Sequence, residues 1–146
     1  MSYDINIVDQ TTGETIETAD PHHIAGGTYQ VGGTTRLWLN ITYNYSPFYY
    51  RAETLGASTA ESEIIESGGM YSLEDLTIPE ARERVLRAIQ HLRDEPLDIH
   101  GKPYKDDTEM PATDYWAPTE ANARRALVNL LQLLCLAPDN AKIQIS

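Results

Sequence analysis

The sequence lacks most of the features that mark a well-defined class of protein. It has one cysteine, Cys135, so no disulfide can form within the chain. It has no run of about 18 apolar residues, the minimum for a membrane-spanning helix, and no basic segment followed by an apolar run opens it. We therefore expect a cytoplasmic protein, and we expect Cys135, inside an apolar run, to be buried and inert.

Basic residues are also scarce. The chain has 11 Lys and Arg against 22 Asp and Glu, a net charge of -11, and such a charge repels phosphate backbones and anionic membranes. Direct binding to nucleic acid or to a membrane is therefore not expected. With 146 residues, of which 41% are hydrophobic, the chain can bury one sizeable core. We expect a single domain covering residues 1–146.

No complete catalytic, metal or cofactor motif is present. Asp20-Pro21-His22-His23 contains ligand types, but neighbouring side chains of an extended segment point apart and no second ligand pair accompanies them. The pairs Gly26-Gly27 and Gly32-Gly33 lack the spacing of a phosphate-binding loop, and tight turns explain them more simply. We predict no metal and no cofactor, and we favour a binding role over catalysis.

The first third of the chain has the pattern of β-hairpins. Residues 4–8 and 14–18 alternate around the turn Thr11-Thr12-Gly13, and residues 28–31 and 35–45 flank Gly32-Gly33. Ser46-Pro47 then resembles a helix start, with Ser46 as the cap and Gly56 as the end of a short helix. Residues 57–69 are expected to be an exposed connection with a short helical turn at 61–66.

The remainder of the chain is predicted to be helical. Thr77 and Glu80 form a capping box that begins a helix over residues 77–93, and a second helix spans 118–136. Apolar residues at helical spacing are expected to face the core. They are Ile78, Ala81, Val85, Leu86, Ile89 and Leu92 in the first helix, and Ala123, Leu127, Leu130, Leu131 and Leu134 in the second. The solvent stripe of the second helix is Asn122, Arg125, Asn129 and Gln132.

Residues 94–117 form a long irregular loop that is either functional or tied down by its aromatic residues, Tyr104, Tyr115 and Trp116. These elements together predict an α+β fold, in which a small antiparallel sheet made of N-terminal hairpins packs against two main α-helices.

The stretch 37–51, L-W-L-N-I-T-Y-N-Y-S-P-F-Y-Y-R, is the strongest indication of a binding site. Alternation places Trp38, Asn40, Thr42 and Asn44 on the face opposite the apolar residues, and an ordinary solvated face is the simplest interpretation. Asparagine is disfavoured in strands unless it makes defined hydrogen bonds, and an exposed Trp38 indicates a pocket or an interface. The tyrosines and Phe48 at positions 43–50 are expected to add aromatic surface nearby. A ligand site is therefore predicted at Trp38, Asn40, Thr42, Asn44, Tyr45, Arg51, Asn122 and Arg125.

Three segments carry a resemblance to a family. N-I-T-Y-N-Y at 40–45, G-G-T at 26–28 and D-Y-W-x-x-T-x-x-N-A-x-x-A-L at 114–127 resemble a group of small proteins encoded by bacteriophages and prophages. Residues 95–110 depart from that pattern, in which the stretch before D-Y-W is shorter. The resemblance implies an accessory protein acting in the bacterial cytoplasm, and such products often antagonise host defence.

Several functional hypotheses remain open. In the first, the protein sequesters a small, nucleotide-like ligand on the residues named above. In the second, it is an acidic inhibitor that imitates nucleic acid and blocks a basic groove of a host protein through Asp106, Asp107 and Glu109. A minor virion or assembly component is a third. Exposed aromatic residues on a sheet face also favour a homo-oligomer.

Overall fold

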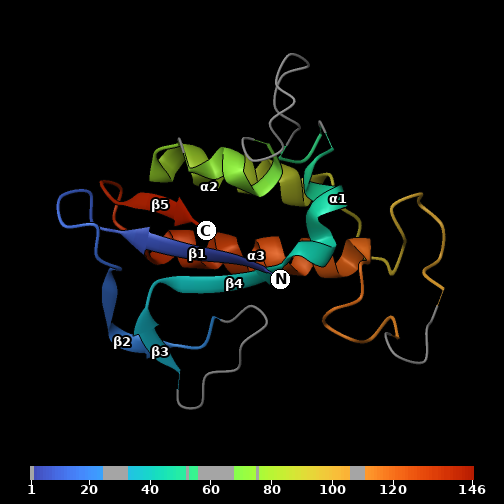
Figure 1. The fold of residues 1–146 in the computed structure, drawn as a ribbon, viewed down its shortest axis with the longest axis horizontal. Coiled ribbons are helices and arrows are strands. Elements are labelled where there is room, and N and C mark those ends of the chain that lie inside the picture. The colour runs from blue at the N-terminus through green and yellow to red at the C-terminus, as the bar shows by residue number, and fades with distance from the viewer. Residues whose placement is uncertain (1, 25–32, 52, 56–67, 75, 106–110) are drawn as a thin grey trace.

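The structure is a computed structural model that describes residues 2–24, 33–51, 53–55, 68–74, 76–105 and 111–146. Its strands are β1 (Ser2–Val8), β2 (Glu17–His22), β3 (Thr34–Arg36), β4 (Trp38–Thr42) and β5 (Lys142–Ile145). Its helices are the 3₁₀ turns η1 (Tyr43–Tyr45) and η3 (Gly69–Leu73) and the α-helices α1 (Ser46–Tyr49), α2 (Ile78–Gln90) and α3 (Glu120–Leu136). The predicted α+β fold is confirmed (Figure 1).

A three-stranded antiparallel sheet in the order β4-β1-β5 forms the centre of the molecule. Ile5 in the middle strand lies opposite Leu39 of β4 and Ile145 of β5. These side chains are buried because alternate residues of a strand point to one face, and α3 packs behind the sheet (Figure 1). The opposite face, called here the outer face, carries Asp4, Asn6, Trp38, Asn40, Lys142 and Gln144.

The sequence-based prediction missed strand β5. We expected the sheet to come from the first 45 residues, but its third strand is Lys142–Ile145 from the end of the chain. The segment K-I-Q-I does alternate, with Ile143 and Ile145 buried and the two polar residues exposed. Four residues are too short a pattern to separate a strand from a loop without a partner strand.

The first predicted hairpin is confirmed at its turn and wrong beyond it. The amide of Asp9 donates to the carbonyl of Glu14 at 2.9 Å, and Val8 bridges Thr15. The returning chain then leaves β1, and β2 pairs with β3 in a separate two-stranded sheet. The proposed strand at 28–31 and the helical turn at 61–66 lie outside the described residues.

The strand predicted to reach residue 45 ends at Thr42, because a 3₁₀ turn follows it. The Thr42 hydroxyl oxygen accepts a hydrogen bond from the Asn44 amide at 3.2 Å, and this bond caps the turn. Ser46 does begin α1, but it is the first helical residue and not the cap. Its hydroxyl instead shares a hydrogen bond with the Tyr3 hydroxyl at 2.5 Å.

Helices α2 and α3 lie against each other and confirm the two main predicted helices. The capping box of Thr77 and Glu80 is present at the start of α2. Arg82 joins the helices by donating to the carbonyls of Leu134 (2.9 Å) and Ala137 (2.7 Å) at the end of α3. The start of α2 therefore lies beside the end of α3, and the two helices run antiparallel.

Leu86 of α2 and Cys135 of α3 are not where their patterns placed them. Leu86 was assigned to the core, yet 47% of it is exposed, because it follows Val85 on a helix whose buried stripe is narrow. Cys135 was expected to be buried but is exposed. It lies in an apolar run whose inward positions on α3 are taken by Leu133 and Leu134. An apolar run longer than one helical turn must place some of its members outside.

Candidate functional site

Asn40, a predicted ligand residue of β4, already has hydrogen-bond partners within the chain. Trp38 is half-buried on the outer face. Asn40 lies on the same face, where its side-chain amide donates to the Ser2 hydroxyl at 2.6 Å and to a carboxylate oxygen of Asp4 at 2.8 Å. These bonds offset the cost of asparagine in a strand, which was the reason for suspecting a ligand.

Three of the five aromatic residues that follow β4 form core instead of surface, and Tyr43 and Tyr50 are half-buried. We predicted surface-forming rings at positions 43–50, but Tyr45, Phe48 and Tyr49 are fully buried. Thr42 is buried too, at 2% exposure, because the chain turns inward after β4. The prediction assumed a strand that continued, and the 3₁₀ turn breaks its alternation.

Asn122 is also buried, at 5% exposure, although we placed it on the solvent stripe of its helix. Its side-chain amide donates to the carbonyls of Asp114 at 2.9 Å and Ala117 at 3.0 Å. Both carbonyls belong to residues 114–117, called here the 114–117 turn. Asn122 lies in the first turn of α3, so these bonds connect the 114–117 turn to the helix that follows it.

The two middle carbonyls of the 114–117 turn are held from the other side, by η1. The Asn44 side chain donates to the carbonyl of Trp116 at 2.8 Å, and the Tyr45 hydroxyl donates to the carbonyl of Tyr115. All four carbonyls of the turn therefore accept hydrogen bonds from predicted ligand residues. The segments 40–45 and 114–127 are joined by these contacts.

Tyrosines surround this junction, and burial changes their acidity. Burial raises the pKa of Tyr3 to about 12 and that of Tyr115 to about 12. It also raises the pKa of Tyr45 and of Tyr49, whose hydroxyl donates to the carbonyl of Ala123 at 2.9 Å. These phenols are neutral hydrogen-bonding groups at ordinary pH, and their positions are structural.

Among the predicted ligand residues, Arg51 lines an open cavity that three other basic side chains also line. This cavity of about 300 Å³, called here the basic pocket, is lined by Arg51, Glu53, His91, Arg93, Ile99, His100, Gly101 and Glu120. They come from the segment after α1, the end of α2, the 94–117 loop and the first residue of α3. Two arginines and two of the four histidines of the chain meet here.

Contacts on three sides hold Arg51 in place. Its guanidinium forms a salt bridge with Glu120 at 3.2 Å, donates to the carbonyl of Ile99 at 2.9 Å and lies 5.1 Å from the centre of the Phe48 ring. Glu120 is buried, and its second oxygen accepts from the amide of Arg93 at 2.5 Å. Arg51 therefore neutralises a buried carboxylate and presents a fixed edge to the pocket.

The other three basic side chains of the pocket are available for a ligand. The side chains of His91, Arg93 and His100 are exposed and make no hydrogen bond or ion pair within the part of the chain that the structure describes. The first amides of α3 are not available, because the carbonyls of Leu97 and Glu95 accept from them. An anion in this pocket would therefore be bound by side chains.

A second cavity of about 360 Å³ adjoins the same turn of α3, and Asn122 and Arg125 are among its lining residues. Arg125 donates to the side-chain oxygen of Asn122 at 3.3 Å. The predicted ligand residues thus separate into the outer face, the 114–117 turn and two neighbouring pockets, and they do not converge on one site.

The remaining candidate sites give no assignment. Asp106, Asp107 and Glu109 lie outside the described residues. Within the described ranges, no group of three or more His, Cys, Asp or Glu side chains could hold a metal ion, and no helix has the length and apolarity needed to cross a membrane. Both ring nitrogens of His22 are engaged, one with the carbonyl of Arg36 at 2.7 Å and one with the amide of Ile24 at 3.2 Å.

Sequence reasoning missed the basic pocket because its members lie far apart in the chain. No motif or spacing in the sequence singled out His91, Arg93 or His100. The chain matches no protein-family model, no curated protein and no solved structure. The function must therefore be argued from this geometry.

Proposed function

We propose that the protein is a non-catalytic binding module that sequesters a small, anionic, nucleotide-like ligand in the basic pocket. The observation that carries this proposal is the gathering of Arg51, His91, Arg93 and His100 around one cavity in a chain of net charge -11. Long-range charge repels anions from most of the surface. The lining also holds Glu53 and Glu120, of which Glu120 is paired with Arg51, so Arg93 and the two imidazoles are the groups that favour an anion here.

The pocket has the parts that such a ligand requires. Its volume of about 300 Å³ is at the lower end of small-ligand cavities, which suits a compact ligand. The fixed guanidinium of Arg51 and the free guanidinium of Arg93 can donate to phosphate oxygens, and the two imidazoles add further donors. Ligand sequestration by a phage-encoded accessory protein would antagonise a host defence that signals through such a molecule.

Calorimetric titration with a panel of mononucleotides, dinucleotides and cyclic nucleotides tests this proposal. We expect one class to bind, and we expect the double change Arg93→Ala and His100→Ala to weaken that binding at least about tenfold, because each lost charged hydrogen bond contributes roughly 1.5–3 kcal/mol. Arg51 is left intact, since its loss would leave the buried carboxylate of Glu120 without its ion-pair partner.

The matched control is Arg87→Ala, which removes an exposed arginine of α2 that lines a different cavity. If Arg87→Ala weakened ligand binding as much as the double variant of Arg93 and His100 does, the loss would be explained by the change in net charge and not by the pocket. Loss of binding in Trp38→Ala, with the pocket variants unaffected, would return the site to the outer face of the sheet.

A second candidate is the acidic inhibitor that imitates nucleic acid. It is supported by the scarcity of charge pairing: the described residues form two salt bridges, while the chain has 22 acidic side chains. Reversal of Asp106, Asp107 and Glu109 to lysine would then abolish capture of a basic host protein, and added salt would weaken the complex of the unaltered chain. A virion component would instead be detected in purified particles.

The proposed homo-oligomer is tested separately. Sedimentation at micromolar concentration is expected to show a species larger than the monomer, and a monomer at every concentration would contradict it.

A further inference from the structure

Strand β5 forms an open edge of the three-stranded sheet. In an antiparallel pair, residues that exchange hydrogen bonds alternate with residues whose amides and carbonyls point away from the partner. Asp4 and Ser146 exchange both bonds, at 2.9 and 3.0 Å, so Gln144 and Lys142 also turn their backbone groups toward β1. The backbone groups of Ile143 and Ile145 therefore point outward.

The outward groups of β5 are only partly satisfied. A carboxylate oxygen of Glu74 accepts from the amide of Ile145 at 2.7 Å, which confirms the outward direction of this amide. No partner for the amide or carbonyl of Ile143 exists in the described part of the chain. The side chains of Ile143 and Ile145 are buried in the core, so the edge is held rigidly in an extended conformation.

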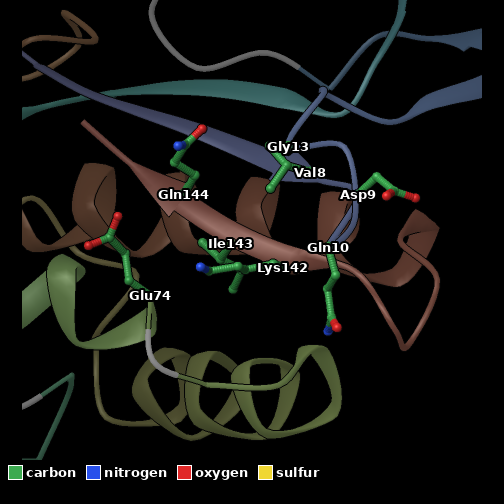
Figure 2. Close-up of a pocket in the computed structure, with 8 residues that line it drawn as sticks. All are labelled: Val8, Asp9, Gln10, Gly13, Glu74, Lys142, Ile143 and Gln144. Carbon is green, nitrogen blue, oxygen red and sulfur yellow. The ribbon is translucent and has the colours of Figure 1, made fainter.

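A cavity of about 290 Å³ lies along this strand (Figure 2). The loop that carries Asp9 and Gln10 closes it at one end of β5, and Glu74 lies toward the other end. Lys142 is the one cationic residue that lines it. One carboxylate oxygen of Asp9 accepts from the amides of Thr11 and Thr12, and these amides, Thr12 first, lower the pKa of Asp9, which keeps it ionised.

We propose that the free edge of β5 binds an extended segment of a basic partner polypeptide by strand addition. The amide and carbonyl of Ile143 pair with the backbone of the added strand, and a Lys or Arg side chain of that strand enters the cavity lined by Asp9 and Glu74. Each of these carboxylates has one oxygen bonded to backbone amides, and the other remains for the incoming cation.

Charge selects a basic partner over a second copy of the chain. At this edge a second copy, of net charge -11, would meet the carboxylates of Asp9 and Glu74, whereas a cationic segment is attracted to them. The edge is also short, and the exposed Lys142 discourages uncontrolled pairing between sheets. This inference uses none of the residues of the basic pocket, so it stands or falls independently of nucleotide binding.

Fluorescence anisotropy with the intact protein provides the test. The probe is a labelled synthetic peptide in which lysine alternates with valine and threonine. Its matched control is the same peptide with N-methyl groups on alternate amides, which keeps the charge but prevents strand pairing. We expect the unmethylated peptide to bind at least about tenfold more tightly, because methylation removes backbone hydrogen bonds and leaves charge attraction alone.

Variants of the protein locate the site. Glu74→Gln keeps an acceptor for the Ile145 amide but removes the charge, and with Asp9→Asn it is expected to weaken binding about threefold to tenfold. Glu83→Gln, the same change on the exposed face of α2, is the control and is expected to have no effect. Hydrogen exchange at the Ile143 amide should slow when the peptide binds.

Three results would overturn the proposal. They are equal affinity for the methylated peptide, unchanged exchange at Ile143, and absence of binding at millimolar peptide concentration. A dimer of the protein that the peptide dissociates would assign the edge to a second copy instead of a basic partner.

Discussion

The two sides of the central sheet differ in whether the polar backbone groups there have hydrogen-bond partners. At the end where β4 runs into η1, the carbonyls of the 114–117 turn accept hydrogen bonds from Asn44, Tyr45 and Asn122. At the β5 edge, the backbone groups of Ile143 lack partners within the described residues. The β4 end resembles a ligand site by residue type but is internally satisfied, whereas the β5 edge has an ordinary composition but unused donors and acceptors.

A polar side chain in an aromatic-rich stretch can serve the protein's own backbone instead of a ligand. A turn packed against the core satisfies its carbonyls where water does not reach them, so amides and hydroxyls are supplied from elsewhere in the chain. Here they come from positions that also suit a ligand. Accessible binding groups are better sought where donors have no partner, as in the basic pocket and at β5.

The largest expected effect is loss of the fold at alkaline pH, beginning at the tyrosine-rich end. An unfolded tyrosine ionises near 10.0, whereas the pKa of both Tyr3 and Tyr115 is raised by burial to about 12. Between these values the folded state holds more protons than the unfolded state, so the free energy of unfolding decreases as pH rises. This contribution is fully present below pH 10.0 and is lost toward pH 12.

Tyrosinate absorbance and circular dichroism measured along one alkaline titration check this prediction. Ionisation of the tyrosines and loss of structure should coincide, and Tyr3→Phe with Tyr115→Phe should reduce the pH dependence. Tyrosinate forming near pH 10.0 in an intact fold would show that these phenols are solvated.

Truncation of Tyr45, at the β4 end, should lower the free energy of unfolding far more than truncation of a residue of β5. Tyr45→Ala removes a fully buried ring and the donor to the Tyr115 carbonyl, and we expect a loss of about 3–5 kcal/mol in the free energy of unfolding. Gln144→Ala at the exposed β5 end should change it by less than about 0.5 kcal/mol. Urea denaturation measures both, and equal effects would remove the distinction between the ends.

A smaller effect is expected at Asn122. Asn122→Ala leaves the carbonyls of Asp114 and Ala117 without the side-chain amide, and each unsatisfied buried group costs roughly 1–3 kcal/mol. Gln132→Ala, on the exposed side of the same helix, is the matched control. If Asn122→Ala kept full stability but abolished nucleotide binding, Asn122 would be a ligand residue and the 114–117 turn would need another explanation.

The smallest effect concerns Cys135, near the end of α3 that leads to β5. Because the thiol is exposed, it should react with a thiol reagent in the native protein at the rate of an unfolded control, and Cys135→Ser should change stability by less than about 0.5 kcal/mol. A thiol protected until the protein unfolds would restore our first expectation of a buried cysteine.

Local patterns predicted the helices well. Thr77 and Glu80 are three residues apart before an apolar repeat, and that spacing alone specifies a reciprocal cap, so the start of α2 was placed correctly. The sheet was harder, because pairing partners are not encoded locally. The alternation at 35–45 indicated a strand but could not reveal that Thr42 would cap a 3₁₀ turn and end it.

The residues of the candidate sites show the same difference between what local pattern predicts and what depends on distant contacts. Arg51 was chosen for its charge and does line the basic pocket, but its ion pair with Glu120 depends on a contact between residues 69 positions apart. His91, Arg93 and His100 have no spacing that links them to Arg51. Asn122 was placed on the wrong side of its helix, since the 114–117 turn covers the side that periodicity assigned to solvent.

By itself, the sequence determined the charge, the start of α2, the end of α3 and the α+β class, because composition, capping and apolar periodicity act over a few neighbouring residues. The tertiary structure alone decided that β5 completes the sheet and that Asn44, Tyr45 and Asn122 bond a loop. It also decided that four basic side chains share one cavity. These outcomes depend on which distant segments meet, and a donor's partner is chosen by proximity in space and not by position in the chain.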